Sequence, residues 1–188
     1  MTFHTEITEL LLSRKIKTKD ELQRAKIQLC KKYNMNTVPP DSEILACLPL
    51  DISEDDRQIT FDLLRKKPMR TISGVAIVAA MTSPEPCPHG RCIPCPGGPK
   101  NNTPQSYTGY EPAAMRAIYN NFDPYLQVKN RIAQLETIGH VTDKVDLIIM
   151  GGTFTARSFE YQYWFVKRCF DALNKTTATN LETAQKKN

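Results

Sequence analysis

The sequence predicts a mixed α/β fold, in which a helical N-terminal region precedes the first strands and helices of a partial TIM barrel. Three observations support this class. Residues 1–70 carry apolar side chains at helical spacing. Residues 72–81 and 145–150 form two apolar runs typical of buried strands, with helical spacing between them. Because a strand, helix, strand order is typical of parallel sheets, we divide the chain into a helical domain, 1–70, and a barrel domain, 71–188.

Two helices of the helical domain are predicted from apolar stripes, which consist of Phe3, Ile7, Leu10 and Leu11 in the first and of Leu22, Ala25, Leu29 and Tyr33 in the second. Val38–Pro40 must interrupt a helix, because proline has no amide hydrogen to donate. Ser53 then begins another helix with a capping-box pattern. Ile59 and Leu63 are expected on its inner face, and Pro68 lies beyond its end.

The formal net charge is +5, and the excess is concentrated in two basic segments. Residues 13–32 contain only Asp20 and Glu21 as acids, against the cations Arg14, Lys15, Lys17, Lys19, Arg24, Lys26, Lys31 and Lys32. Such a stripe predicts a polyanionic partner, although a solvated helix face has the same composition. The second segment, 65–70, adds Arg65, Lys66, Lys67 and Arg70 and favours RNA or DNA as the partner.

The barrel domain is predicted to alternate strands and helices. Its elements are a strand covered on both faces at 72–81, helices at 111–121 and 123–139, a second buried strand at 145–150, a helix to residue 174 and a polar tail with a helix start. Two parallel strands neither close a barrel nor make an ordinary open sheet, and they leave sheet edges unpaired. We therefore expect an N-terminal fragment, or a chain that needs a partner to complete its fold.

The hydrophobic share is 40%, and no uninterrupted apolar run approaches the roughly 20 residues of a membrane span. Residues 1–12 contain acids and lack the basic start of a signal peptide. We therefore expect a soluble, cytoplasmic protein. In a reducing compartment the six cysteines are better interpreted as metal ligands and buried thiols than as disulfides, with Cys30, Cys47 and Cys169 in the buried role.

The other three cysteines form the pattern C-x4-C-x2-C directly after the first predicted strand, where α/β barrels carry their active sites. A structural zinc site needs four ligands, and His89 lies awkwardly close to Cys87 in sequence to be one of them. A ferredoxin-type cluster needs a fourth cysteine, which has no suitable spacing here. Three thiolates suit a four-iron, four-sulfur cluster with one iron open to S-adenosylmethionine. Spacing alone leaves this cluster and zinc about equally favoured.

A glycine pair ends the second predicted strand in the segment Gly151–Phe154. Bare backbone at such a position can approach a ligand closely and offer its amides and carbonyls to an amino acid. An ordinary tight turn explains the pair equally well when it is considered alone. Because the cysteine loop and the glycine pair follow neighbouring predicted strands, together they favour a ligand site at that end of the sheet.

Three segments taken together closely resemble the catalytic subunit of Elongator, the family of tRNA wobble-uridine carboxymethyl transferases. They are TISGVAIVAAMTSPEPCPHGRCIPCPGGP, TPQSYTGYEPAAMRAIYNNFDPY and DKVDLIIMGGTF. The resemblance covers about residues 60–174, includes the helical start more loosely and is strongest to the archaeal members. It implies a tRNA-binding region, a radical S-adenosylmethionine barrel and an acetyltransferase-like domain that binds acetyl-CoA. The last of these is absent from this chain.

The resemblance also implies roles for particular residues. An adenosyl radical would activate the acetyl group of acetyl-CoA, which is then joined to the wobble uracil of the tRNA anticodon. The cluster ligands would be Cys87, Cys92 and Cys95, while Gly151 and Gly152 would line the S-adenosylmethionine site. Lys144 matches a lysine associated with acetyl-CoA, and tRNA phosphates would be met by Lys66, Lys67 and Arg70.

Two alternatives to an enzyme stay open at this stage. A non-catalytic module would bind tRNA through its basic helices and hold zinc or a cluster structurally. A truncated piece without activity of its own would lack most of the walls of its site, and a C-terminal chain or a second copy would have to supply them.

Overall fold

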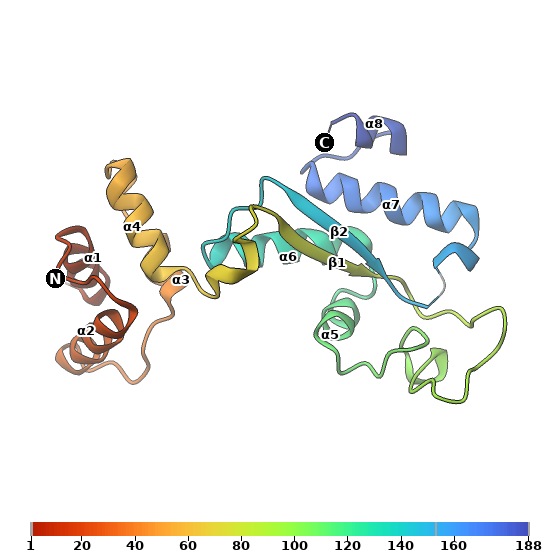
Figure 1. The fold of residues 1–188 in the computed structure, drawn as a ribbon, viewed down its shortest axis with the longest axis horizontal. Coiled ribbons are helices and arrows are strands. Elements are labelled where there is room, and N and C mark those ends of the chain that lie inside the picture. Colours follow the sequence, from red (N-terminus) through yellow and green to blue (C-terminus); the bar gives the residue numbers. More distant parts are fainter. Residues whose placement is uncertain (1, 153, 188) are drawn as a thin grey trace. The chain divides into compact units, whose positions relative to one another are not determined.

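The computed structural model describes residues 2–152 and 154–187 and has the expected mixed α/β character (Figure 1). The chain divides into two compact units, Met1–Ala76 with Gln134–Lys144 and Ile77–Ala133 with Val145–Asn188. The elements are α1 (Phe3–Leu12), α2 (Lys19–Lys32), α3 (Asp41–Ala46), α4 (Glu54–Leu64), β1 (Ala76–Met81), α5 (Pro112–Tyr119), α6 (Pro124–Thr137), β2 (Val145–Met150), α7 (Phe159–Leu173) and α8 (Leu181–Gln185), with 3-10 turns at Pro68–Thr71, Pro99–Asn101 and Phe154–Ala156.

The first unit packs α1 to α4 around one apolar core. The apolar stripes predicted for α1 and α2 both contribute to this core. Its buried residues are Phe3, Ile7, Leu11, Ile16, Leu22, Leu29, Cys30, Ile44 and Leu64. Helix α3 is an addition to the predicted elements, since its six residues are too few to show a period. Thr18 caps α2 in a capping box, and Ser53 caps α4 by accepting a hydrogen bond from the Asp56 amide.

The inner face of α4 differs from the prediction. Ile59 is 40% exposed, whereas Thr60 and Leu64, one helical turn apart, are buried. Leu63 is partly buried against the core, as expected. The prediction of Ile59 as an inner residue was therefore wrong, because the position of Leu64 in the core fixes the rotation of the helix and carries Ile59 toward solvent.

The sheet of the described residues consists of β1 and β2, which run parallel. The amide of Ala76 donates to the carbonyl of Lys144, and the amide of Thr82 donates to the carbonyl of Met150, at 2.8 Å in both cases. The pairing therefore keeps one register from beginning to end. Figure 1 shows that both strands finish at the same end of the sheet, where the cysteine loop leaves β1.

Both strands are less covered than their composition suggests. The first strand begins at Ala76 instead of residue 72, because Pro68–Thr71 forms a 3-10 turn and Gly74 has a φ of +77°. Val78 is fully buried, but Ile77 on the other face of β1 is 54% exposed and Ile148 of β2 is 41% exposed. The expectation of strands covered on both faces was therefore wrong. An apolar side chain is more stable when it is buried, but its presence in a strand does not ensure that a helix or another sheet packs against that face.

Helix α7 and the segment after it form one compact arrangement. Cys169 and Asp171 of α7 are fully buried. The carboxylate of Asp171 accepts a hydrogen bond of 2.9 Å from the Ala178 amide and pairs with Lys167 at 2.8 Å. The polar tail thus includes α8, which Asn180 caps. Among the described residues there is no helix with the length and apolar character that crossing a membrane requires.

Candidate cysteine-lined site

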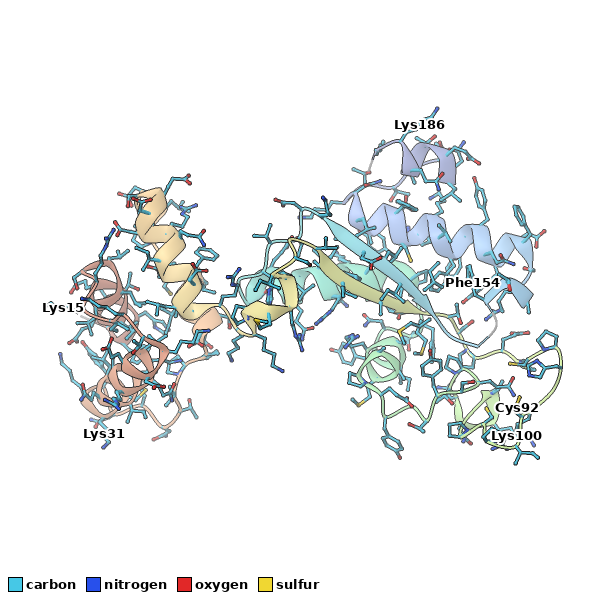
Figure 2. The ribbon with its side chains drawn as sticks, in the orientation of Figure 1. Lys15, Lys31, Cys92, Lys100, Phe154 and Lys186 are labelled. Atoms are coloured by element: carbon cyan, nitrogen blue, oxygen red, sulfur yellow. The ribbon has the colours of Figure 1, made fainter. Side chains whose placement is uncertain are left out.

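The three cysteines of the C-x4-C-x2-C pattern lie on the loop between β1 and α5 and line one cavity of about 500 Å³. Figure 2 labels Cys92 on this loop. Gly152, which follows β2, lines the same cavity together with Gln105. The cavity therefore lies where the two parallel strands end, and residues far apart in the sequence form its wall. This juxtaposition brings the predicted cluster ligands and one of the two predicted glycines together.

Each thiol has a different environment. Cys95 is buried, and its sulfur accepts a hydrogen bond of 3.2 Å from the Ser106 amide. Cys92 is exposed, and its sulfur lies 3.2 Å from Nε2 of His89. Cys87 is half-buried, and its backbone amide donates to the side-chain oxygen of Gln105. Hydrogen bonds thus hold the loop at Cys87 and Cys95, whereas Cys92 is exposed.

The donor set fits a thiolate-bound iron-sulfur cluster in kind. Cysteine sulfurs are the ligands that such clusters use, and three of them line a single cavity. Within residues 2–152 and 154–187, however, no group of three or more Cys, His, Asp or Glu side chains converges closely enough to hold a metal ion. Cluster binding would therefore require the three thiols to converge more closely than they do here.

The two glycines of the pair have different roles in the structure. Gly151 has a φ of +130°, and a Cβ at this position would collide with the side chain of Thr82. A Cβ at Gly152 would make only ordinary van der Waals contacts, the shortest of which is 3.6 Å to the Cys87 sulfur on the cavity wall. Gly151 is therefore required by the fold, and Gly152 leaves room in the cavity. Thr153 of the same motif lies outside the described residues.

Gln105 is a site residue that sequence reasoning did not single out. Its side chain is 6% exposed and holds the loop at the first cysteine. It lines the cysteine cavity and also a second cavity of about 360 Å³, to which Arg91 and Lys100 contribute cations. The only signal for Gln105 in the sequence was its place within the segment TPQSYTGYEP, because buried glutamine has no pattern of its own.

Lys144 is not among the residues that line the cysteine cavity. It is exposed, directly precedes β2, and its carbonyl accepts the Ala76 hydrogen bond. Because Gly151 directly follows β2, the predicted acetyl-CoA and S-adenosylmethionine residues flank that strand at its two ends.

The predicted tRNA-binding residues Lys66, Lys67 and Arg70 are all exposed. They lie in and beside the 3-10 turn Pro68–Thr71, which Lys67 enters with a φ of +52°. No ion pair involving these three side chains occurs among the described residues. The structure thus leaves three solvated cations on one short segment.

The basic stripe of residues 13–32 has fewer unpaired cations than its sequence suggests. Lys26 is buried and pairs with Asp41 at 2.7 Å, while Arg14 pairs with Asp56 and Lys32 with Glu6. Hydrogen bonds from Lys32 and then Tyr33 lower the pKa of Glu6, so this carboxylate stays charged at neutral pH. Lys15 and Lys31 remain exposed, and Figure 2 shows them on the surface of the helical unit.

Cys30 and Cys169 are buried, as predicted. Burial, followed by the charge of Asp123, raises the pKa of Cys169 to about 12. Cys47, in contrast, is exposed, so its predicted buried role was wrong. It follows the last residue of α3, where the chain turns away from the core of the unit.

The chain is similar to several known proteins. Residues 1–72 match the family model described as the ELP3 N-terminal domain. A "tRNA uridine(34) acetyltransferase" of Methanocaldococcus jannaschii is 60% identical over 153 residues, which are 80% of this chain and 28% of the relative. "Elongator complex protein 3" of Homo sapiens is 41% identical over 174 residues, which are 88% of this chain and 31% of the relative.

A solved structure of Methanocaldococcus infernus Elp3 with its N-terminus deleted (1–46) is 46% identical, with a TM-score of 0.43, and covers 61% of this chain and 19% of that chain. The helical unit and the cysteine-lined cavity at the ends of parallel strands define a mixed α/β protein, and its residues 1–72 match the ELP3 N-terminal domain. The chain is similar to Elp3 proteins, and these archaeal relatives are more similar to it than the eukaryotic ones. It spans about 28% of the length of the archaeal relatives.

Proposed function

We propose that this chain contributes to the modification of tRNA wobble uridines, as the N-terminal part of a radical S-adenosylmethionine enzyme with an incomplete TIM barrel. Two archaeal relatives, from Methanocaldococcus jannaschii and Methanocaldococcus infernus, are named tRNA uridine(34) acetyltransferase. The observation that carries the proposal is the cavity in which three thiols and Gly152 meet at the ends of two parallel strands. Loops at this end of parallel strands are the usual place for catalytic groups in α/β proteins.

In this proposal Cys87, Cys92 and Cys95 would hold a four-iron, four-sulfur cluster. A bound cluster with one open iron would supply the electron for reductive cleavage of S-adenosylmethionine. The chain itself would do three things: hold the first thiol through Gln105, hold the third through the Ser106 amide, and leave space for the amino acid part of the ligand at Gly152. Acetyl-CoA would be the co-substrate, with Lys144 as its contact in this chain.

The basic residues provide the proposed tRNA contact. Lys66, Lys67 and Arg70 are solvated and close together in sequence, which suits binding to phosphates of the anticodon region without sequence reading. The proposal places the reaction in the cytoplasm. Further strands would come from a C-terminal chain segment or from a second copy.

The test is anaerobic reconstitution of the 188-residue chain with iron and sulfide, followed by iron counting and electron paramagnetic resonance with and without S-adenosylmethionine. We expect a cluster whose spectrum changes when S-adenosylmethionine is added. The variant Cys92→Ala should lose the cluster, and Cys47→Ala, which removes an exposed cysteine outside the cavity, should retain it. Full iron content in Cys92→Ala would refute the assignment of the ligands.

The second candidate is a non-catalytic tRNA-binding module with structural zinc or a cluster. The solvated cations of the helical unit favour it, because they need no cofactor to act. It predicts binding of tRNA that weakens steeply with salt and persists in Cys92→Ala. Zinc retained after reconstitution, together with an unchanged spectrum in S-adenosylmethionine, would favour this candidate over the enzyme.

A further inference from the structure

Arg157 joins the segment after β2 to the start of the cysteine loop. Its guanidinium donates to the backbone carbonyl of Ser83 at 2.9 Å and to the hydroxyl of the same residue at 3.1 Å. A carboxylate oxygen of Glu85 lies 3.7 Å from the guanidinium. The Arg157 side chain is only 13% exposed, so these interactions are largely shielded from water. One buried cation therefore holds three acceptors of the loop.

Tyr161, in the first turn of α7, contacts both Arg157 and Ser83. The Arg157 guanidinium stacks on the Tyr161 ring at 3.7 Å from its centre. The Tyr161 hydroxyl accepts a hydrogen bond of 3.0 Å from the Ser83 amide and lies 3.2 Å from the Ser83 hydroxyl. Ser83 is thus held at its amide, its carbonyl and its side chain, which leaves its backbone little freedom.

The position of Ser83 makes this attachment relevant to the cysteines. It precedes the Pro84–Pro86 stretch, and Cys87 follows directly. Proline restricts its own φ and the conformation of the residue before it, so a displacement at Ser83 passes along the stretch to Cys87 with little loss. Arg157 and Gly152 also line a small cavity of about 20 Å³ together with Thr82 and Glu85. This small cavity shares Gly152 with the cysteine-lined cavity, so Arg157 lies next to the candidate site.

We propose that Arg157, stacked on Tyr161, is a positioning residue that sets the entry of the cysteine loop relative to Gly152. A planar guanidinium can serve two acceptors of one residue while it stacks on a ring, and an ammonium cannot do both. The role rests on the proposed function in one respect: the loop is positioned for cluster binding. The attachment itself is a property of the chain without iron and is tested first in that form.

The first measurement is amide hydrogen exchange of residues 83–95 in the reduced, iron-free chain. We expect Arg157→Lys to accelerate exchange of this segment about tenfold and Arg157→Ala to accelerate it further, because hydrogen bonds to a charged group are among the stronger ones in proteins. Tyr161→Phe should accelerate mainly the Ser83 amide, since both contacts of the lost hydroxyl, to the amide and to the side chain, are with Ser83. Unfolding midpoints measured in parallel show whether any change is local.

Arg168→Lys is the matched control. Arg168 lies on α7, the helix of Tyr161, and stacks on the ring of Tyr125 at 4.5 Å. Its ion-pair partner is Asp171, which does not belong to the cysteine loop. We expect this control to leave the exchange of residues 83–95 unchanged. Equal exchange in the wild type, Arg157→Lys and Arg157→Ala would overturn the proposal, as would equal acceleration by the Arg168 control.

The second measurement separates this inference from the proposed function. In reconstituted protein we expect at least a threefold smaller change of the paramagnetic resonance spectrum on adding S-adenosylmethionine in Arg157→Lys than in the wild type, at equal iron per chain. If the wild type takes up no iron, the proposed function fails, and hydrogen exchange still decides whether Arg157 positions the loop. If the wild type responds and Arg157→Lys responds equally, the positioning role fails and the proposed function stands.

Discussion

Gly151 lies so close to Thr82 that a Cβ on the glycine would collide with the threonine side chain. The contact arises because the two residues follow β2 and β1, whose final hydrogen bond joins the Thr82 amide to the Met150 carbonyl. The strand ends are therefore drawn together by backbone pairing, and only glycine fits between them. Its neighbour Gly152 has no such restriction and faces the cysteine cavity.

This difference predicts opposite results for two similar substitutions. Gly151→Ala should destabilise the chain by about 2 kcal/mol or more, because it combines a strained backbone with a collision. Gly152→Ala should cost less than about 0.5 kcal/mol, since its methyl group has ordinary space. Urea unfolding measures both. Equal stability of the two variants would contradict the structure at this point.

Gly152→Ala should nevertheless affect the candidate site. Its methyl group would lie 3.6 Å from the Cys87 sulfur and occupy part of the cavity. We therefore expect the reconstituted variant to retain iron while its spectrum responds at least several-fold more weakly to S-adenosylmethionine. A response equal to that of the wild type would remove Gly152 from the proposed ligand site.

The cysteines should differ widely in their reaction with iodoacetamide in the iron-free chain at pH 8. Cys92 and Cys47 are exposed and should be alkylated first, and Cys169 last, because burial raises the pKa of its thiol to about 12. The ordinary value is 9.0, so this thiol contributes stability that is present below pH 9 and is lost as pH rises toward 12. Mass spectrometry of peptides at timed intervals gives the order, and early labelling of Cys169 would disprove its burial.

Asp171 should be among the most sensitive positions of the second unit. Burial acts to raise the pKa of this carboxyl, but the Ala178 amide, Lys167 and Arg168 outweigh it, so the pKa is lowered from 3.8. Its contribution to stability is therefore present above pH 4 and is lost as pH falls below that value. Asp171→Asn should cost about 3 kcal/mol at pH 7, because two cations lose their buried partner. The cost should shrink toward pH 3, and a cost independent of pH would contradict this account.

The pair Lys26–Asp41 provides a parallel test in the helical unit. Lys26 is buried, so Asp41→Ala would leave its charge without a partner and should cost about 3 kcal/mol. The more exposed pair of Arg14 and Asp56 is the control, and Asp56→Ala should cost under about 1 kcal/mol beyond the loss of the hydrogen bond that its carboxylate accepts from the Ser53 hydroxyl. Replacing Lys26 by Met and Asp41 by Leu together should restore most of the stability. Thermal unfolding of the wild type and these three variants decides, and a small loss of stability in Asp41→Ala would show that Lys26 reaches water.

The sequence alone determined the helices other than α3, the presence of both strands and the grouping of three thiols after the first strand. These features are local: apolar spacing defines α1 and α2, Ser53 and Pro112 mark helix starts, and C-x4-C-x2-C is visible without a fold. The resemblance to the Elongator subunit rested on equally local segments. Such properties depend on residues close together in the chain, so the pattern of the sequence is sufficient to predict them.

Only the tertiary structure decided which residues meet. Lys26 became a buried partner of Asp41 instead of a surface cation, Gln105 came to hold Cys87, and Arg157 reached back to Ser83. Each of these contacts joins residues at least 15 positions apart, where the sequence carries no periodic signal. Packing of α2 against its neighbours decides the first of these contacts, whereas parallel pairing of β1 with β2 brings the segments of Ser83 and Arg157 to one end of the sheet.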